Sequence, residues 1–377
     1  MKLAILGQAY LHDPTANVNG TLVQLHNLAH AFSNHGIEVH YVSLTKDKEK
    51  PTYELNNGIH FYWIQYSRGL LAWKNVMASY KKKLLVIAPD VVYVRGRNVM
   101  QYLAGNYARE LDAKYVWNTN GDDSAEFWKN VKRLKASNKT WIKKIILLPL
   151  KVYEDYYINE GMKMVDLVIN QSEWQKKETK KRLNKTGVVL PSYFLPVVNT
   201  LPKENVLLWM ANLSRAKQPK RFIDIVAKLD MHNWKAILAG GTTDDKFEKE
   251  VKEYDLSHVV EFVGKVPFKE SFVYYQKAKI FVNTSLPDAD GLPNAYIQSW
   301  LSGTVTVSLH HDPNNWMDKH NIGYCAHGDF TKLVEKLKYL MQHPKELSVM
   351  GNNAIEFAEQ KFSSHTIIDD YVNLLKS

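Results

Sequence analysis

The sequence has little cysteine and no long hydrophobic run, and these two shortages narrow the class of protein. Cys325 is the single cysteine among 377 residues, which excludes an internal disulfide and favours a reducing compartment. No stretch approaches the ~20 apolar residues that a membrane-spanning helix needs. The apolar run at residues 3–7 is shorter than the ~7–15 residues of a signal-peptide core. We therefore expect a cytoplasmic protein without a spanning segment.

Signatures of metal centres and of the common nucleotide-binding loops are missing as well. Residues 310–312 read His-His-Asp, but no further ligand at metal-site spacing accompanies them. The chain has neither a Gly-Lys-Ser/Thr phosphate loop nor a Gly-x-Gly-x-x-Gly fingerprint. We predict no metal site and no bound cofactor.

The chain does contain the alternation of strands and helices that is typical of an α/β protein. Its 377 residues exceed most single cores, and a hydrophobic content of 45% is ample for burial. Apolar strands alternating with amphipathic helices predict doubly wound parallel sheets. Pro196 and Pro202 mark residues 195–205 as a linker between two domains. Strands are predicted at residues 2–7, 37–43, 59–65, 91–95, 115–118, 167–170, 206–211, 234–239, 259–263, 280–282 and 304–307.

Residues 285–308 combine a strand end, an acidic turn, a helix and a second strand. Asp290 lies in the turn, and Gln298 follows it by about two helical turns. We therefore expect both side chains on the side of the helix that the turn faces. Open α/β sheets bind their ligands at this edge, outside the carboxyl ends of the strands.

Other polar loops follow predicted strands and should lie at the same edges. Residues 8–21 form a long loop that ends in Asn19-Gly20 just before a helix, and Lys217 lies in a donor-rich loop at residues 212–219. Backbone amides at a helix N-terminus favour phosphate groups. Arg95 ends one predicted strand in the first half of the chain, and Asn120 and Asp122 follow another. All three are candidate acceptor contacts.

These stretches together resemble the retaining nucleotide-sugar glycosyltransferases of family 4. That family has Glu-Gly-Phe-Pro-Asn, three further residues, Glu-Ala, and then a glycine before a β-branched strand. Asp and Gln here replace the two Glu residues of the family. The chain has at these positions Asp290, Gly291, Leu292, Pro293 and Asn294, then Gln298 and Ser299, then Gly303, Thr304 and Val305.

Further positions match the family in part. Its donor-phosphate loop reads Gly-Arg-Leu, three residues, Lys; here Asn212 replaces the Arg, while Lys217 falls on the Lys. Arg215 is close enough to take over from the missing Arg. Asn19-Gly20 replaces a Gly-Gly pair whose backbone amides approach the donor's phosphates in the family, so the resemblance implies a donor-binding role for both residues. Asn120 stands where many members have a histidine. The turn at residues 264–267, with Val266, resembles the turn whose backbone meets the nucleotide base.

The resemblance implies a GT-B fold, with two doubly wound Rossmann-like domains facing across a cleft. Residues 1–198 would form the acceptor-side domain and residues 199–355 the donor domain, while the final helix, about 356–377, would pack back on the first. Lys217 and Arg215 would stabilise the departing diphosphate, Asp290 the donor sugar, and Gln298 the ribose.

The implied reaction is transfer of a sugar, with retention, from a UDP- or GDP-sugar to a hydroxyl of a glycan or lipid-linked acceptor in cell-surface polysaccharide synthesis. No metal is required, because cationic groups screen the diphosphate. Two alternatives remain open at this stage. A non-catalytic paralogue would bind a nucleotide sugar or a partner enzyme without transfer, and an epimerase would consume donor without an acceptor.

The net charge of +10 is concentrated in part at residues 126–151, where eight basic residues accompany one acid. Trp128, Trp141 and Ile145 are among the apolar residues interleaved with them. This mixture is typical of a segment that meets anionic lipid headgroups, which would place the protein peripherally at the inner membrane face. A solvated helix covering the domain's own core is an equal alternative, and we expect no nucleic-acid partner.

Overall fold

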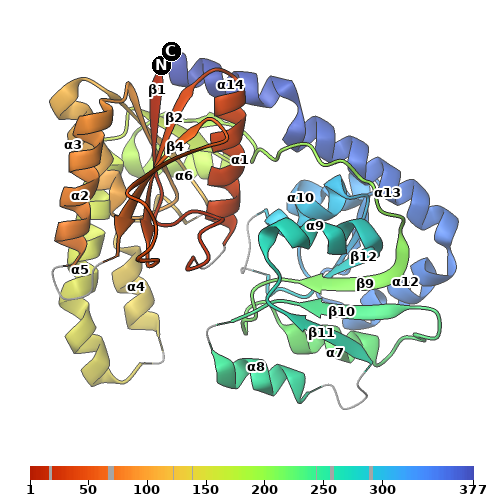
Figure 1. The fold of residues 1–377 in the computed structure, drawn as a ribbon. Helices are drawn as coiled ribbons and strands as arrows, with labels where there is room; N and C mark the ends of the chain where they lie inside the picture. Colours follow the sequence, from red (N-terminus) through yellow and green to blue (C-terminus); the bar gives the residue numbers. More distant parts are fainter. Residues whose placement is uncertain are drawn as a thin grey trace. The chain divides into compact units, whose positions relative to one another are not determined.

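The computed structural model describes residues 1–16, 19–66, 72–121, 123–137, 139–242, 244–254, 259–287 and 292–377, with the backbone alone at residues 72 and 73. The chain forms two compact units (Figure 1). Unit 1 comprises Met1–Leu195 and His365–Ser377, and unit 2 comprises Pro196–Ser364. Each unit has a sheet and a hydrophobic core of its own.

The sheet of unit 1 has eight strands in the order β3-β4-β2-β1-β5-β6-β7-β8. All neighbours are parallel except β3, which pairs antiparallel with β4 at one edge. Strand β3 is not among the strands expected from the sequence, because its four mostly exposed residues are too few for the alternation of Tyr53 and Leu55 with polar residues to indicate a strand. The strands are β1 (Lys2–Leu6), β2 (Glu38–Thr45), β3 (Tyr53–Asn56), β4 (Ile59–Gln65), β5 (Val91–Arg95), β6 (Lys114–Asn118), β7 (Leu167–Asn170) and β8 (Val188–Val189).

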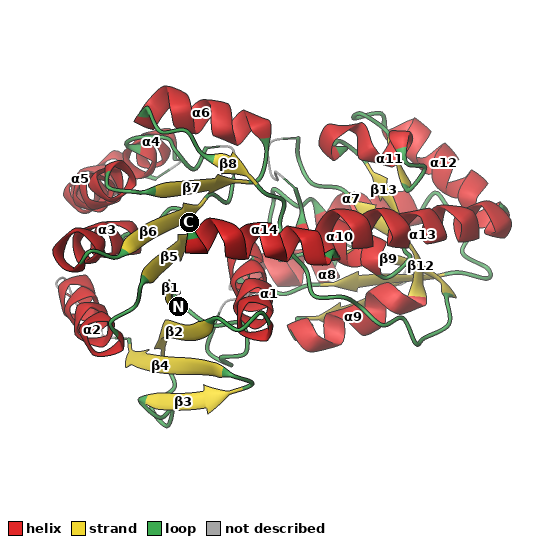
Figure 2. Ribbon diagram, turned by 90° about the horizontal axis from the view of Figure 1, so that it is seen from above, coloured by secondary structure: helices red, strands yellow, loops and turns green. Residues whose placement is uncertain are grey.

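Helices cover both faces of this sheet (Figure 2). Successive strand residues point to opposite faces, so Leu3 packs with α1 and α14, whereas Ala4 packs with α2, α3 and α5. The helices of unit 1 are α1 (Gly20–Asn34), α2 (Ala72–Ile87), α3 (Met100–Leu111), α4 (Lys129–Ala136), α5 (Trp141–Lys163), α6 (Glu173–Leu183) and α14 (His365–Lys376).

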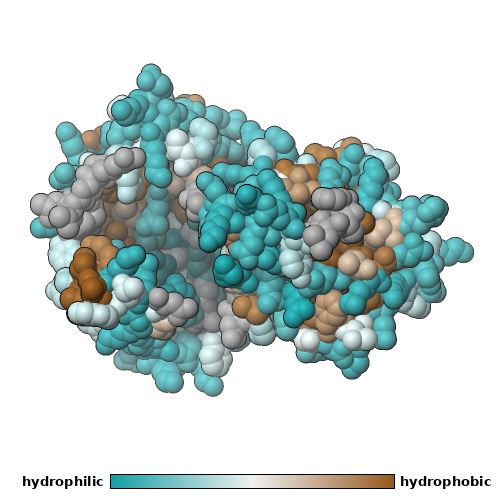
Figure 3. Space-filling view, turned by 90° about the horizontal axis from the view of Figure 1, so that it is seen from below, coloured by the Kyte–Doolittle hydropathy of each residue, from teal (hydrophilic) through white to brown (hydrophobic). Residues whose placement is uncertain are grey.

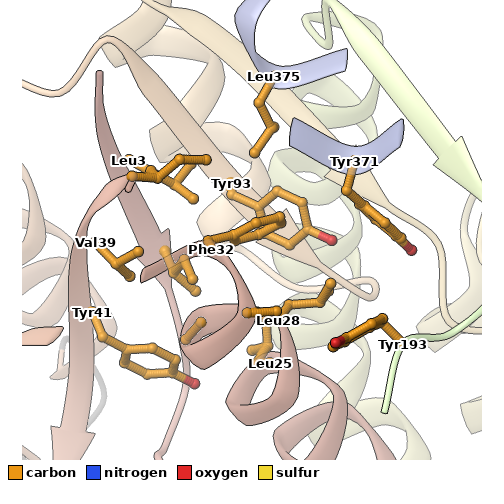
Figure 4. Close-up of a cluster of buried hydrophobic side chains, with 14 of the residues drawn as sticks. Leu3, Leu25, Leu28, Phe32, Val39, Tyr41, Tyr93, Tyr193, Tyr371 and Leu375 are labelled. Atoms are coloured by element: carbon orange, nitrogen blue, oxygen red, sulfur yellow. The ribbon is translucent and has the colours of Figure 1, made fainter. Parts of the chain in front are cut away.

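The last helix, α14, completes the core of unit 1 although it is about 170 residues further along the chain than β8. Tyr371 and Leu375 project from α14 into the cluster that holds Phe32 of α1 and Tyr93 of β5 (Figure 4). Lys114 fixes the end of the helix by donating from Nζ to the carbonyl of Leu374 at 2.7 Å. The first and last parts of the chain therefore share one core.

Unit 2 has a six-stranded parallel sheet in the order β11-β10-β9-β12-β13-β14. Its strands are β9 (Glu204–Met210), β10 (Lys235–Ala239), β11 (Val260–Gly264), β12 (Ala278–Asn283), β13 (Val305–Ser308) and β14 (Gly323–Cys325). Its helices are α7 (Pro219–Val226), α8 (Asp245–Lys252), α9 (Phe268–Lys277), α10 (Asn294–Leu301), α11 (Trp316–Lys319), α12 (Phe330–Gln342) and α13 (Pro344–Ala358), with a 3₁₀ turn at Pro313–Asn315 and a π-helical turn at Glu359–Ser363.

Candidate functional site

A pocket of about 440 Å³ lies in unit 1. The residues that follow β1, β2, β5 and β6 line it, together with the first turn of α1. The carboxyl ends of parallel strands meet at one edge of a sheet, which is why segments so far apart in sequence reach one pocket. Asn19, Arg95 and Asn120, three of the predicted site residues, all line this pocket.

Asn19 is the N-cap residue of α1, and Gly20 is the first residue of the helix. The Asn19 side-chain oxygen accepts hydrogen bonds from the backbone amides of Thr21 at 3.0 Å and Leu22 at 3.2 Å. The first turn carries no acidic side chain, so the positive end of the helix dipole is not neutralised from within the helix. An anion beside this turn would be stabilised.

Asn120 links Arg95 to α1. Arg95 Nε donates to Asn120 Oδ1 at 3.0 Å, and Asn120 Nδ2 donates to the hydroxyl of Thr21. The Ser124 hydroxyl accepts from the Asn120 backbone amide at 3.1 Å and shapes the loop. Asp122, the third predicted acceptor contact, lies outside the described residues.

Asp13 lines the same pocket and was not singled out from the sequence. It is 3% exposed, and its Oδ1 accepts from the amide and the hydroxyl of Thr15 at 2.8 and 2.7 Å. Its Oδ2 has no hydrogen-bond partner within the described part of the chain. A buried carboxylate oxygen with open lone pairs suits a sugar hydroxyl. The only sequence signal was its place in the long loop before α1.

In unit 2, the loop between β9 and α7 carries Asn212 and Lys217. This loop passes so close to the end of β10 that a Cβ on Gly240 would lie 2.0 Å from the carbonyl oxygen of Ala211. The Leu213 amide donates to the Gly241 carbonyl at 3.0 Å. The absence of a side chain at Gly240 therefore allows the close approach of the predicted phosphate loop.

Two residues of the segment that follows β12 donate hydrogen bonds to the Lys217 loop. The Thr284 hydroxyl donates to the Lys217 carbonyl at 2.9 Å, and the Leu286 amide donates to the Ala216 carbonyl at 2.8 Å. The Thr284 hydroxyl in turn accepts from Trp209 Nε1 at 2.9 Å. The structure thus brings the predicted phosphate loop together with the start of residues 285–308, whereas Asp290 and Gly291 lie outside the described residues.

Arg215 is 80% exposed and lies over the ring of Phe247, with Nη2 3.7 Å from a carboxylate oxygen of Glu250. Lys220 Nζ reaches the other oxygen of Glu250 at 2.8 Å. The hydrogen bond and charge of Lys220, aided by Arg215, lower the pKa of Glu250. Exposed ion pairs contribute little free energy, so the Arg215 side chain is not firmly held by this pair.

Gln298 is 7% exposed on α10, and its Nε2 donates to the Ser271 hydroxyl of α9 at 3.4 Å. Pro293 is the buried N-cap residue of α10, Asn294 begins the helix, and Leu292 precedes them half-buried. The half-buried Val266 lies in the turn between β11 and α9, just before the helix that carries Ser271. The Gln298–Ser271 contact therefore ties α10 to the helix that follows the predicted base-binding turn. The amide group of Gln298 is used at least in part within the fold.

The residues that the structure describes contain neither a metal cluster nor a membrane-spanning helix. Within those ranges, no group of three or more His, Cys, Asp or Glu side chains has an arrangement that could hold a metal ion. Among the helices in the same ranges, none has both the length and the apolar character needed to cross a membrane.

Family models match both halves of the chain. The model described as Glycosyltransferase Family 4 matches residues 18–191, and the model described as Glycosyl transferases group 1 matches residues 195–357. The chain belongs to the GT-B glycosyltransferases of group 1 and family 4. The expected family and the expected GT-B fold are therefore confirmed.

Two curated relatives of known activity resemble this glycosyltransferase. One is the Campylobacter jejuni α-1,4-N-acetyl-D-galactosaminyltransferase that acts on a diNAcBac-PP-undecaprenol-linked disaccharide, 26% identical over 184 residues, or 47% of this chain and 49% of that protein. The other is the poly(ribitol-phosphate) α-N-acetylglucosaminyltransferase of Staphylococcus aureus, 21% identical over 230 residues, or 59% of this chain and 46% of that protein. The alignments span about half the length of the curated relatives.

Solved structures share the fold over the whole chain. Sucrose-phosphate synthase from Thermosynechococcus elongatus superposes with a TM-score of 0.71 at 18% identity, over 100% of this chain and 98% of that one. HepE from Anabaena, in complex with UDP and glucose, gives a TM-score of 0.71 at 15% identity, over 100% and 99%. At these identities the likeness supports the fold alone.

Proposed function

We propose that this protein transfers a sugar, with retention at the anomeric carbon, from a nucleotide-diphosphate sugar to a hydroxyl of a glycan or lipid-linked acceptor. Family membership supports sugar transfer. The observation that carries the donor assignment is the set of hydrogen bonds that join the Lys217 loop to the segment after β12. They hold the backbone of the Lys217 loop against the start of the stretch that resembles the family's donor-sugar motif, and this supports the assignment.

The proposed roles in unit 2 follow from the chemistry of each group. Lys217 neutralises the charge that builds up on the leaving diphosphate, and Arg215 swings from Glu250 to assist it. Asp290 holds hydroxyls of the donor sugar, and Gln298 meets the ribose with the part of its amide not used by Ser271. Backbone groups complete the donor site at Asn212, Val266, Gly291, Leu292, Pro293 and Asn294.

Unit 1 is proposed to take the acceptor. Its pocket offers Arg95 and Asn120 for polar groups, with Asp122 in the loop that follows. Asn19 and Gly20 supply further backbone donors for a phosphate at the start of α1. The departing phosphate itself receives the proton of the acceptor hydroxyl, so that no protein base and no metal ion are required.

We further propose that α5 places this enzyme on an anionic membrane surface, where a lipid-linked acceptor would be met. The first half of α5 carries apolar side chains that face solvent; Trp141 is 70% and Ile146 69% exposed. Figure 3 shows hydrophobic side chains gathered at the left of the view from below, the side on which Figure 1 draws α5. The other exposed apolar residues of the helix are Ile142, Ile145, Leu150, Val152 and Tyr156.

Lysines accompany this apolar stripe. Within the described ranges, Lys135, Lys139 and Lys143 form no ion pair, whereas Lys129 and Lys132 are paired with acids of unit 1. Unpaired lysines beside exposed Trp and Ile side chains match an interface with an apolar interior and anionic headgroups. The occupant we commit to is therefore a lipid surface.

Binding of nucleotides tests the proposed function. Thermal unfolding of the full chain is followed with UDP, GDP, ADP, UDP-sugars and GDP-sugars, for wild type, Lys217→Ala and the exposed control Lys228→Ala. A ligand at ~100 times its dissociation constant adds about 2.7 kcal/mol of stability, so one nucleotide class should raise the melting temperature of wild type and control but not of Lys217→Ala.

Turnover of the donor that binds then separates the possible reactions. Sugar appearing on an acceptor supports transfer, whereas conversion of the donor alone would point to an epimerase. If none of the nucleotides shifts the unfolding of wild type, the assignment of the donor site is wrong, and a role in binding a partner takes its place.

A further inference from the structure

Arg95 is a buried cation with no carboxylate partner among the residues that the structure describes. The residue is 1% exposed at the end of β5. Its Nε donates to the Asn120 side-chain oxygen at 3.0 Å and its Nη2 to the Ser192 hydroxyl at 3.4 Å, and both partners are neutral. Within the described part of the chain no acid lies at ion-pair distance, and Nη1 makes no hydrogen bond of acceptable geometry. A buried charge without a counter-charge is strongly destabilising.

The remaining neighbours of Arg95 are also neutral. Burial raises the pKa of Tyr93 and of Tyr371, and the charge of Arg95 partly offsets this rise in both. The two phenols therefore stay protonated at neutral pH. Asn118 donates from Nδ2 to both phenol oxygens, at 2.8 and 3.2 Å. None of these groups compensates the guanidinium charge.

Arg97, two residues further along, shows that the fold can supply such a partner. Its Nη2 lies 2.7 Å from Asp155 Oδ1, and both side chains are buried. The same carboxylate accepts from the amides of Asn130 and Val131 at the start of α4, at 3.2 and 2.9 Å. Arg97 is thus neutralised within unit 1, whereas Arg95, the last residue of β5, has no such partner in the described part of the chain.

The uncompensated arginine lines the pocket of unit 1. Asn98 and Asn120 beside it add neutral polar groups, and the exposed Lys46 adds a second positive charge. Among the described lining residues the acid is Asp13, which does not pair with Arg95. The pocket therefore has a local excess of positive charge around a buried guanidinium, which is the arrangement that binds phosphate or carboxylate oxygens.

We propose that Arg95 binds an anionic group of the acceptor, a phosphate or a carboxylate, in the pocket of unit 1. The assignment of the anion to the acceptor rests on the proposed function, whereas the anion site itself does not depend on it. A bound anion supplies the counter-charge that the described residues do not give to this guanidinium. A neutral glycan would leave the guanidinium uncompensated, so the site selects acceptors that carry negative charge next to the sugar that is extended.

Calorimetric titration of the full chain with inorganic phosphate tests the site, with and without saturating UDP. Wild type should bind phosphate in both cases. Arg95→Gln should weaken that binding by roughly tenfold to a hundredfold, the range of a charged hydrogen bond, whereas Arg109→Gln, which removes the same charge from an exposed position on α3, should not. Arg95→Lys keeps the buried positive charge and should show an intermediate loss of phosphate affinity. This variant tests the site if Arg95→Gln does not fold.

Glycerol 3-phosphate, dimethyl phosphate and glucuronate then distinguish a phosphomonoester, a phosphodiester and a carboxylate as the anion. Equal phosphate affinity in wild type and both Arg95 variants would overturn the proposal. It would also be overturned if UDP displaced the phosphate and Arg95→Gln lost UDP binding, because the anion would then be the donor's diphosphate. Absence of nucleotide binding alone would instead count against the proposed function and leave the phosphate result standing.

Discussion

At the scale of single residues, Lys203 joins segments of unit 2 that are far apart in the sequence. Its Nζ donates to the carbonyls of Tyr275 and Ala278 at 3.0 and 2.8 Å and to the Thr304 hydroxyl at 2.7 Å. Burial lowers the pKa of this ammonium group from 10.5 to about 7. The folded chain therefore releases a proton that the unfolded chain retains up to its ordinary pKa.

This difference predicts a pH dependence of stability. Between about pH 7 and 10.5 the unfolded state binds more protons at Lys203, so the free energy of unfolding should rise with pH, by up to about 1.4 kcal/mol per pH unit from this group. Chemical denaturation at pH 7, 8 and 9 measures it as the difference between wild type and Lys203→Met, with the half-exposed Lys277→Met as control. If the free energy of unfolding changed equally with pH in all three proteins, the three oxygen acceptors would be keeping the Lys203 ammonium group charged in the fold.

The residues of the candidate site differ in how far the sequence alone reveals them. Lys217, Asn19 and Asn120 could be selected from the sequence because each follows a strand and precedes or adjoins a helix. Asp13 and the contrast between Arg95 and Arg97 could not, because they depend on partners as distant as Asp155. Charge compensation is set by contacts across the fold and leaves no local pattern.

At the scale of elements, α5 behaves as two halves. Its second half is buried against α3, where a Cβ on Gly161 would lie 2.4 Å from the backbone nitrogen of Tyr102. Its first half carries the exposed apolar stripe, and Pro149 lies between the two. The sequence indicated the basic and apolar composition here, whereas only the packing against α3 shows which half is anchored.

Vesicle binding tests the membrane role of this helix. Wild type should co-sediment with vesicles that contain phosphatidylglycerol but much less with phosphatidylcholine alone, and binding should fall as salt screens the lysines. Ile146→Asp should weaken binding at least several-fold with little effect on stability, because the side chain is exposed. Val349→Asp on α13 is the matched control. Equal binding of wild type and Ile146→Asp would remove α5 from the proposed interface.

At the scale of the whole molecule, the two units differ in how the chain builds them. Unit 1 needs both ends of the chain, since α14 supplies Tyr371 and Leu375 to its core. Unit 2 is one continuous segment, Pro196–Ser364, with its own hydrophobic cluster around β9, β10, β12 and β13. A continuous segment with a complete core has what independent folding requires.

We therefore predict that residues 196–364 fold alone. The segment should unfold cooperatively in denaturant, and it should bind whichever nucleotide stabilises the full chain, with an affinity within roughly tenfold, because the proposed donor groups in unit 2 remain together. Residues 1–195 without α14 should be much less stable, since removing large buried side chains costs about 2–5 kcal/mol each. Fluorescence-monitored unfolding of both fragments measures this, and a fragment 196–364 without a cooperative transition would contradict the prediction.

The sequence by itself determined the class of fold and the family, because strand and helix periodicity and the spacing of the motif at residues 285–308 are local properties of the chain. It also placed most strands of both sheets, since buried parallel strands are short apolar runs. Tertiary structure decided the rest. It set β3 at an edge, brought Gly240 against the phosphate loop and carried α14 back to unit 1. It also gave Arg97 a carboxylate, whereas Arg95 has none among the described residues. Each of these depends on which distant residues meet, and in a fold stabilised by long-range packing that information does not reside in any single stretch.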